Sequence, residues 1–183
     1  PVKGEIEILE NGVKFLVNIV DGQKTGFFLD QRENRKALQK YVDTKTLLNC
    51  FCYTAGFSVY AALAGATEIT SVDVSGAALE TAKRNFEINN LPTKKHEFVD
   101  ADVFDFLEKC QRERRRFDVI ILDPPAFVKN KASLAKGLSG YLFVNEKALK
   151  LLPSGGILVS SSCSAHVTDE MFVKMLSLAA SRA

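Results

Sequence analysis

Residues 117–127, FDVIILDPPAF, carry the strongest signal for the fold class of this chain. Its apolar, largely β-branched run ends at Asp123, and two prolines then stop the chain. A segment that is apolar on both faces is typical of a central parallel strand covered by helices. Such a strand would place Asp123 at its carboxyl end, where open α/β sheets bind their ligands. Pro124 and Pro125 make the following loop stiff, although an ordinary buried strand with an X-Pro turn would look the same.

Strands and helices alternate on both sides of this stretch. We expect strands near residues 47–52, 68–73, 95–99, 117–122 and 156–161, separated by helices near 56–64, 76–89, 102–110 and 140–152, with a last helix from 169. This order predicts an α/β, Rossmann-like fold with a mostly parallel sheet. Ser75 is expected to cap the helix that follows the second strand.

A different pattern precedes the sheet. Residues 2–28 alternate apolar and polar side chains, and Asn11-Gly12 and Asp21-Gly22 interrupt the alternation. These dipeptides are strong signals for tight hairpin turns, because both central residues need a positive φ. The segment is therefore predicted to be a small antiparallel β-meander.

A short helix should link this meander to the sheet. Asp30 and Glu33 resemble a capping box, which would open a helix that reaches about Tyr41. We therefore divide the chain into residues 1–43, the meander and short helix, and residues 44–183, the ligand-binding α/β domain.

Composition sets broad limits. The 183 residues are 46% hydrophobic and 25% charged, with a formal net charge of +2, as in an ordinary globular domain. We expect a cytoplasmic location, with no membrane partner, because no apolar run approaches the ~20 residues of a spanning helix. Cys50, Cys52, Cys110 and Cys163 form no C-x-x-C pair, and only two histidines accompany them. This pattern favours free thiols and argues against a metal site.

The turn after the first strand, residues 53–57, could hold a nucleotide. A dinucleotide fingerprint needs three glycines, whereas Gly56 is the only one here. The predicted ligand is therefore a nucleoside without a pyrophosphate, and the alternative is a plain strand-to-helix turn. Asp73 ends the second strand, where an acid can accept hydrogen bonds from ribose hydroxyls.

Further acids follow the next strands. Asp100 or Asp102, after the third strand, could accept a hydrogen bond from an adenine amine, with Val103 or Phe104 stacking on the ring. Alone, either acid is better explained as a helix cap. Together with Asp123, they favour a ligand site along one edge of the sheet.

Cys163 follows the fifth strand and should share this edge. A thiolate is a soft nucleophile suited to an activated ring carbon, although most cysteines are buried and inert. We interpret the other three cysteines as packing residues.

Basic residues flank the central stretch. Lys129, Lys131 and Lys136 follow the prolines, on the expected ligand side, where they could contact nucleic-acid phosphates or merely be hydrated. Phe127 could stack on a displaced base. The arginine-rich run 112–116 precedes the strand and is predicted to be a solvated turn at the opposite edge.

Taken together, these residues resemble the class I S-adenosylmethionine-dependent methyltransferases, and specifically the bacterial family that makes 5-methylcytosine in large-subunit ribosomal RNA. The resemblance covers nearly the whole chain. Its motifs are GQKTGFFLDQR at 22–32, YTAGFSVYAA at 53–62, SVDVS at 71–75, DPPAF at 123–127 and SCS at 162–164.

The resemblance implies a role for each of these motifs. Expected cofactor contacts are Tyr53, Thr54, Ala55, Gly56 and Phe57 for the methionine part, Asp73 and Val74 for the ribose, Asp102 and Val103 for the adenine, and Asp123. Expected catalytic residues are Cys163 and Asp123, and expected substrate contacts are Arg32, Pro124, Pro125, Phe127, Lys129 and Lys131. The implied cofactor is S-adenosylmethionine and the implied partner is RNA; no metal is implied, and the sequence carries no indication of oligomeric state.

The implied reaction proceeds through an adduct between Cys163 and C6 of cytosine. Two alternatives stay open: an RNA N-methyltransferase that holds a purine on the 123–127 loop, and a cofactor-binding fragment that does not turn over.

The chain departs from the family in three respects. Ala55 replaces a usual glycine, which should be tolerated if φ at this position is negative. A separate RNA-binding domain and the last two of the usual seven strands are not recognisable, so the fifth strand is expected to leave an uncovered sheet edge.

Overall fold

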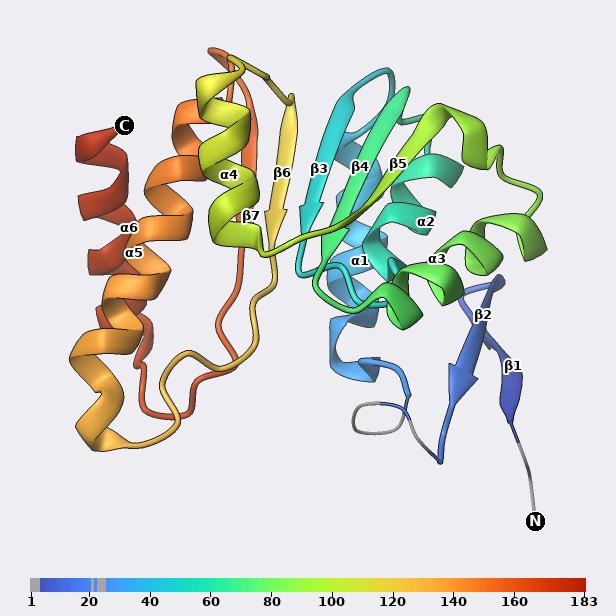
Figure 1. Ribbon diagram of the computed structural model, residues 1–183, viewed down its shortest axis with the longest axis horizontal. Helices are drawn as coiled ribbons and strands as arrows, with labels where there is room; N and C mark the ends of the chain where they lie inside the picture. Colours follow the sequence, from blue (N-terminus) through green and yellow to red (C-terminus); the bar gives the residue numbers. More distant parts are fainter. Residues whose placement is uncertain (1–3, 21, 23–25) are drawn as a thin grey trace.

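The computed structural model describes residues 4–20, 22 and 26–183 of the chain. These residues form an antiparallel hairpin and a five-stranded parallel sheet that lies between two groups of helices (Figure 1). No helix within this described part is both long and apolar enough to cross a membrane.

The five strands predicted for the parallel sheet are all present: β3 (Thr46–Cys50), β4 (Glu68–Asp73), β5 (His96–Asp100), β6 (Val119–Leu122) and β7 (Ile157–Ser160). The hairpin strands are β1 (Glu5–Glu10) and β2 (Val13–Asn18). The helices are α1 (Arg32–Leu38), α2 (Gly56–Leu63), α3 (Gly76–Ile88), α4 (Val103–Arg112), α5 (Leu134–Leu151) and α6 (Asp169–Arg182). The sheet order is β5-β4-β3-β6-β7.

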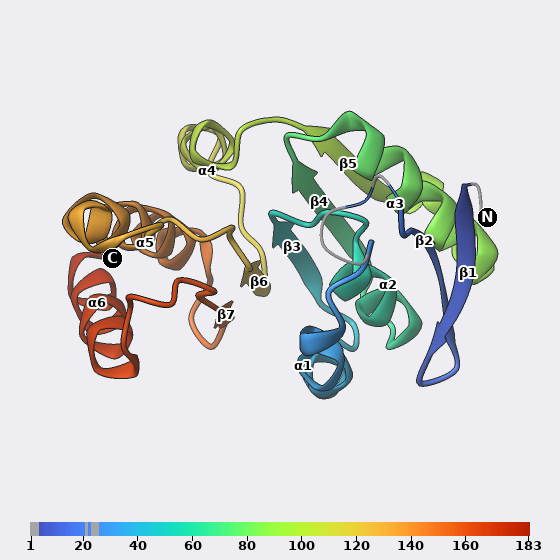
Figure 2. The same cartoon turned by 90° about the horizontal axis from the view of Figure 1, so that it is seen from below.

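Alternate residues of the central strands supply two separate cores. Leu47 of β3 and Ile121 of β6 belong to a hydrophobic cluster on the side of α1, α2 and α3. Leu48 and Ile120 belong to a second cluster on the side of α4 and α5 (Figure 2). The central strands are apolar throughout because both faces are covered, as the 117–122 stretch predicts.

The strand order creates a crevice at the middle of the sheet. The chain passes from β3 to β4 and β5 in one direction and then crosses back to β6, on the other side of β3. In open α/β sheets, such a switch point opens a crevice outside the carboxyl ends of the strands. Here those ends belong to β3 and β6.

The N-terminal segment forms a two-stranded hairpin. Asn11 and Gly12 have φ values of 52° and 82°, which confirms the predicted tight turn. Phe15 and its alternate neighbours on β2 are buried, and the Leu16 N–H donates to Asn85 Oδ1 of α3 at 2.8 Å. Asp21 of the second predicted turn lies outside the described residues, and residues 26–28 belong to no strand.

Two predicted helix starts are wrong, whereas Ser75 does cap α3 by accepting from Ala78 N. Asp30 lies inside a 3₁₀ turn and does not cap α1, whose N-cap is Gln31 without a side-chain bond. Helix α5 begins at Leu134, six residues before the predicted start at 140, because the preceding turn carries an Asn130/Ser133 capping box.

A buried ion pair ties the hairpin to α1. Arg35 donates from Nε and Nη2 to Glu10 at 2.8 and 2.7 Å, and both side chains are only 3% exposed. The Arg35 guanidinium also lies 4.4 Å from the centre of the Phe27 ring. The division of the chain at residue 43 stays a prediction, since Phe15 and Leu47, one from each side, belong to the same core cluster.

The arginine run at 112–116 is more structured than a solvated turn. It precedes β6 and lies at the amino ends of the strands, as predicted. However, Arg115 is half-buried and donates to Glu97 at 2.8 Å and to Thr70 at 3.2 Å. This ion pair lowers the pKa of Glu97.

Candidate active site

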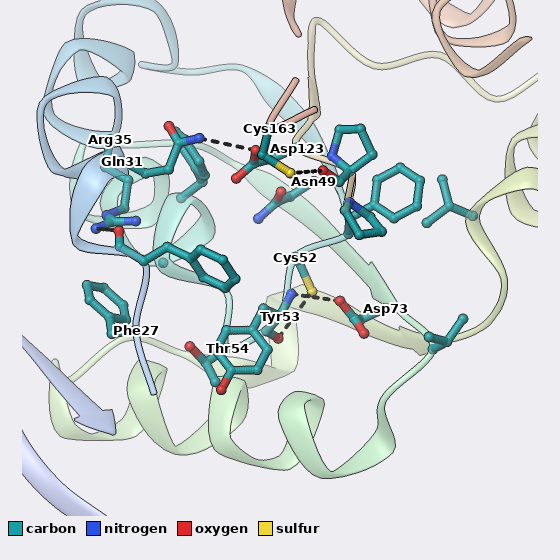
Figure 3. A pocket seen from close by; sticks show the side chains of 18 of the residues that line it. Phe27, Gln31, Arg35, Asn49, Cys52, Tyr53, Thr54, Asp73, Asp123 and Cys163 are labelled. Atoms are coloured by element: carbon teal, nitrogen blue, oxygen red, sulfur yellow. Dashed lines mark hydrogen bonds between the residues drawn. The ribbon is translucent and has the colours of Figure 1, made fainter. Parts of the chain in front are cut away.

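A cavity of about 360 Å³ opens at the carboxyl ends of β3, β4, β5, β6 and β7. This volume lies within the range of small-molecule sites. Most of the predicted site residues line it: Tyr53, Thr54, Gly56, Phe57, Asp73, Val74, Asp102, Val103, Asp123, Pro124, Pro125, Phe127 and Cys163. Asp73 and Cys163, the two ends of the predicted site, therefore face one cavity (Figure 3).

The loop that follows β3 has an unusual backbone. Phe51, Tyr53 and Ala55 have φ values of 58°, 49° and 60°, so left-handed residues recur at every second position. Ala55 is fully buried and does not line the cavity. The condition of a negative φ at Ala55 is not met: the residue adopts the conformation that favours glycine, at a cost of about 1–2 kcal/mol.

Asp73 anchors this loop while keeping acceptor capacity. Its Oδ2 accepts from the Tyr53 N–H at 2.8 Å and its Oδ1 accepts from the Ser75 N–H at 3.0 Å. A carboxylate offers about four acceptor positions. Asp73 can therefore hold the backbone and still accept from a diol.

Asp102 combines a structural role with a place at the cavity. Its Oδ1 accepts from the N–H groups of Phe104 and Asp105, which caps α4 as the alternative interpretation suggested. The side chain is exposed and lines the cavity beside Val103 and Phe104. This capping role leaves the other oxygen available to a ligand amine.

A buried amide supplies a further polar group at the cavity. Asn49 of β3 is 1% exposed, and its Nδ2 donates to Ser58 Oγ at 2.9 Å. Its Oδ1 has no hydrogen-bond partner among the described residues, and Asn49 lines the cavity. An orphaned buried acceptor costs free energy, and a ligand donor would satisfy it. The acceptors Asp73, Asp102 and Asn49 with the apolar walls fit the amine and hydroxyl donors of an adenosyl amino acid.

Two hydrogen bonds from different segments hold the Asp123 carboxylate. Gln31 Nε2 donates to Asp123 Oδ1 at 3.1 Å (Figure 3), and Ser161 Oγ donates to the same oxygen at 2.5 Å. Gln31 precedes α1 and Ser161 follows β7, so segments far apart in the sequence meet at this carboxylate. Asp123 is thereby fixed in orientation.

Cys163 lies beside Asp123 and is the exposed thiol of the chain, whose four cysteines are all free. Its Sγ–H donates to the Pro124 carbonyl at 3.7 Å, as expected of a loop in which prolines present their carbonyls. Burial raises the pKa of the Cys50 and Cys52 thiols and raises that of Cys110 to about 11. These three cysteines are buried, as expected of packing residues, although Cys52 also lines the cavity.

Three predicted substrate contacts lie outside the cavity lining. Arg32 is exposed and pairs with Glu33 at 2.9 Å. Lys129 and Lys131 are exposed on the loop between β6 and α5. The predicted contacts of these three residues with RNA would therefore be made on the protein surface outside the cavity.

The sequence analysis did not assign a role at the site to eight of the residues that line the cavity. The unassigned lining residues are Phe27, Phe28, Asp30, Gln31, Arg35, Asn49, Phe51 and Cys52. Phe28 packs edge-on against Tyr53, with ring centres 5.6 Å apart, and Arg35 lies over Phe27. Several of these residues fall in the 22–32 motif, which was the available signal, but no spacing rule connects that motif to the sheet.

Comparison with known proteins gives a consistent result. The family described as S-adenosylmethionine-dependent methyltransferase matches residues 2–180. The chain is 48% identical over 179 residues to "Ribosomal RNA large subunit methyltransferase I" of Pseudoalteromonas atlantica, covering 98% of this chain and 45% of that protein. The protein of the same name from Klebsiella pneumoniae is 46% identical, with 98% and 46% covered.

Solved structures agree with these sequence relatives. A methyltransferase crystallised with SAH (S-adenosylhomocysteine) has a TM-score of 0.89 and 36% identity, covering 98% of this chain and 47% of that one. A SAM-dependent methyltransferase from Streptococcus mutans has a TM-score of 0.88 and 35% identity, with 98% and 46% covered. The chain spans about half the length of these relatives. Because the family model matches residues 2–180, the chain belongs to the S-adenosylmethionine-dependent methyltransferase family.

Proposed function

We propose that this chain is the catalytic part of an RNA methyltransferase that modifies C5 of a cytosine in large-subunit ribosomal RNA through an adduct with Cys163. The observation that carries the proposal is the exposed Cys163 thiol, which lines the same cavity as Asp73 and Asp123. The relatives named as large-subunit ribosomal RNA methyltransferases support the RNA substrate.

The residues of the cavity divide between cofactor and substrate. Asp73 and Val74 would hold the ribose, Asp102 and Val103 the adenine, and residues 53–57 the methionine part. When bound, S-adenosylmethionine supplies the methyl group that the base acquires. Asn49 Oδ1, the orphaned acceptor at the cavity, suits an ammonium donor of the same ligand.

The chemistry of the base explains the need for a thiol. C5 of cytosine is a poor nucleophile. Addition of the Cys163 sulfur to C6 breaks the C5–C6 double bond and makes C5 enamine-like. Once C5 carries the methyl group, loss of its proton and cleavage of the C6–S bond restore the aromatic ring and release the thiol. Asp123, which accepts hydrogen bonds from Gln31 and Ser161, would hydrogen-bond the base edge.

The surroundings of Cys163 suit a base that has left a helical stack. Pro125 is exposed at the cavity, and Phe127 lines it, while the Phe127 ring also packs 4.7 Å from that of Tyr141. Lys129 and Lys131 are exposed on the same loop, and Arg32 is exposed near the start of α1. These three side chains would contact RNA phosphates.

The test measures methyl transfer and its position. The chain, incubated with isotope-labelled S-adenosylmethionine and unmodified large-subunit ribosomal RNA, should yield 5-methylcytidine in the digested nucleosides by mass spectrometry. RNA that contains 5-fluorocytosine should form a covalent complex that survives denaturation, because fluorine at C5 cannot leave as a proton does.

Variants of two cysteines make the test specific. Cys163→Ser should abolish both the product and the covalent complex and should keep SAH affinity. Cys110→Ala, at a buried cysteine outside the cavity, should keep both. Normal cytosine methylation by Cys163→Ser would refute the mechanism, methylation of a purine nitrogen would refute the substrate atom, and SAH binding without transfer would refute catalysis by this chain.

A further inference from the structure

Tyr141 of α5 is fully buried, and its hydroxyl contacts both serines that flank Cys163. Ser162 Oγ donates to Tyr141 Oη at 3.0 Å, and Tyr141 Oη lies 2.8 Å from Ser164 Oγ. Either Tyr141 or Ser164 can be the donor in the second bond. One buried hydroxyl therefore holds the chain on both sides of Cys163.

This arrangement determines where the thiol points. Ser162 and Ser164 reach the same atom, so both lie on the α5 side of the loop. The residue between them faces the other way, and Cys163 is indeed exposed and lines the cavity. Ser164 N also donates to Ser162 Oγ at 3.3 Å, which closes the short loop on itself.

Tyr141 also connects this loop to the one that follows β6. Ser164 Oγ accepts from the Val128 N–H at 3.1 Å, and the Tyr141 ring lies 4.7 Å from that of Phe127. The same β6 loop carries Pro124, whose carbonyl accepts from the Cys163 thiol. The two loops that present Asp123 and Cys163 are thus joined by one side chain that does not itself line the cavity.

We propose that Tyr141 is a positioning residue that sets the place of the Cys163 sulfur relative to the β6 loop. This inference rests on the proposed function, in which that sulfur attacks the base. Removing the Tyr141 hydroxyl would leave the ring packing in place and take one hydrogen bond from each serine, while Ser164 Oγ would keep the bond from Val128 N. A reacting atom misplaced by ~1 Å can lower a rate by on the order of 10²-fold.

The decisive variant is Tyr141→Phe, studied by two measurements. The kcat for cytosine methylation should fall by on the order of 10²-fold, while Kd for SAH stays within about twofold, because Tyr141 is outside the cavity lining. In the absence of RNA, alkylation of Cys163 by iodoacetamide, followed by mass spectrometry, should accelerate at least about fivefold, because the variant loses two hydrogen bonds and the loss of one alone is a population factor of about five. The other three cysteines are buried and should not react.

The chain offers a matched control in Tyr60. This tyrosine is also buried, and its hydroxyl donates to the Glu10 carbonyl at 3.0 Å, but it does not line the cavity or contact the Cys163 loop. Tyr60→Phe should change stability by a similar amount and leave the alkylation rate unchanged. At the flanking serine, Ser162→Ala should reproduce the effect of Tyr141→Phe, whereas Ser162→Thr, which keeps the hydroxyl, should restore the wild-type rates.

Unchanged alkylation of Cys163 in Tyr141→Phe would overturn the proposal, and so would a kcat within twofold of wild type. If Tyr141→Phe does not fold, the contrast between Ser162→Ala and Ser162→Thr decides in the same way. Should Cys163→Ser prove active, the proposed function fails, yet the alkylation rates would still report whether Tyr141 positions this thiol.

Discussion

The buried pair between Glu10 and Arg35 allows a quantitative prediction. Both side chains are 3% exposed and share two hydrogen bonds of 2.7 and 2.8 Å. Glu10→Ala would leave the guanidinium buried without a carboxylate partner, donating to the Phe28 carbonyl at 2.9 Å. Breaking a buried pair in this way costs about 3–5 kcal/mol. In a domain of this length, each kcal/mol lowers Tm by about 2–4 °C, so Tm should fall by roughly 6–20 °C.

Urea unfolding and calorimetry would measure this loss, and a double variant tests its cause. Glu10→Met combined with Arg35→Met removes both charges, so it should recover most of the stability, because no buried charge is left unpaired. Glu33→Ala breaks the exposed pair with Arg32 and serves as the control; it should change stability by less than about 1 kcal/mol.

Two results would refute this reasoning. A loss below about 1 kcal/mol in Glu10→Ala would mean that the freed guanidinium reaches water and is not trapped. A double variant as unstable as the sum of its single variants would mean that the side chains act by packing alone and not as a charge pair.

The remaining predictions concern packing, the cofactor and pH. Gly137→Ala should destabilise the fold by about 1–3 kcal/mol in urea unfolding and lower kcat, because a Cβ there would lie 2.3 Å from Val128 Cγ2; an unchanged midpoint would argue against this clash. Asp73→Asn should weaken SAH binding by roughly 10- to 100-fold in titration calorimetry, the range for hydrogen bonds to a charged group, and equal affinity would exclude a role for the charge. Desolvation, followed by nearby Lys95, lowers the pKa of His96 below its ordinary value of 6.5. The unfolded chain therefore binds more protons than the folded one as pH falls through 6.5, so this residue should reduce stability at low pH. His96→Gln should make the loss of stability between about pH 7 and pH 5 smaller, and an identical pH profile would contradict this assignment.

Patterns that depend on neighbouring residues were readable in the sequence. The period of apolar residues predicts the five parallel strands, and the Asn11-Gly12 dipeptide predicts the hairpin turn, because both depend on local backbone preferences. The acids at strand ends follow from the same pattern, since parallel strands place their carboxyl ends at one edge. The α5 start was also encoded locally, in Asn130 and Ser133, but the 3₁₀ turn between this capping box and the helix obscured the signal.

Other features were decided by the tertiary structure alone. The Gln31 contact to Asp123 spans 92 positions, and the Tyr141 contacts to Ser162 and Ser164 span 21 and 23. No local periodicity links such residues; the sheet order and the packing of α5 bring them together. The fold class could be predicted from residue patterns, and so could the edge of the sheet on which Asp73, Asp123 and Cys163 lie. The orientation of each side chain on that rim required the folded chain, because hydrogen bonds between distant segments are set by geometry that no short window of residues contains.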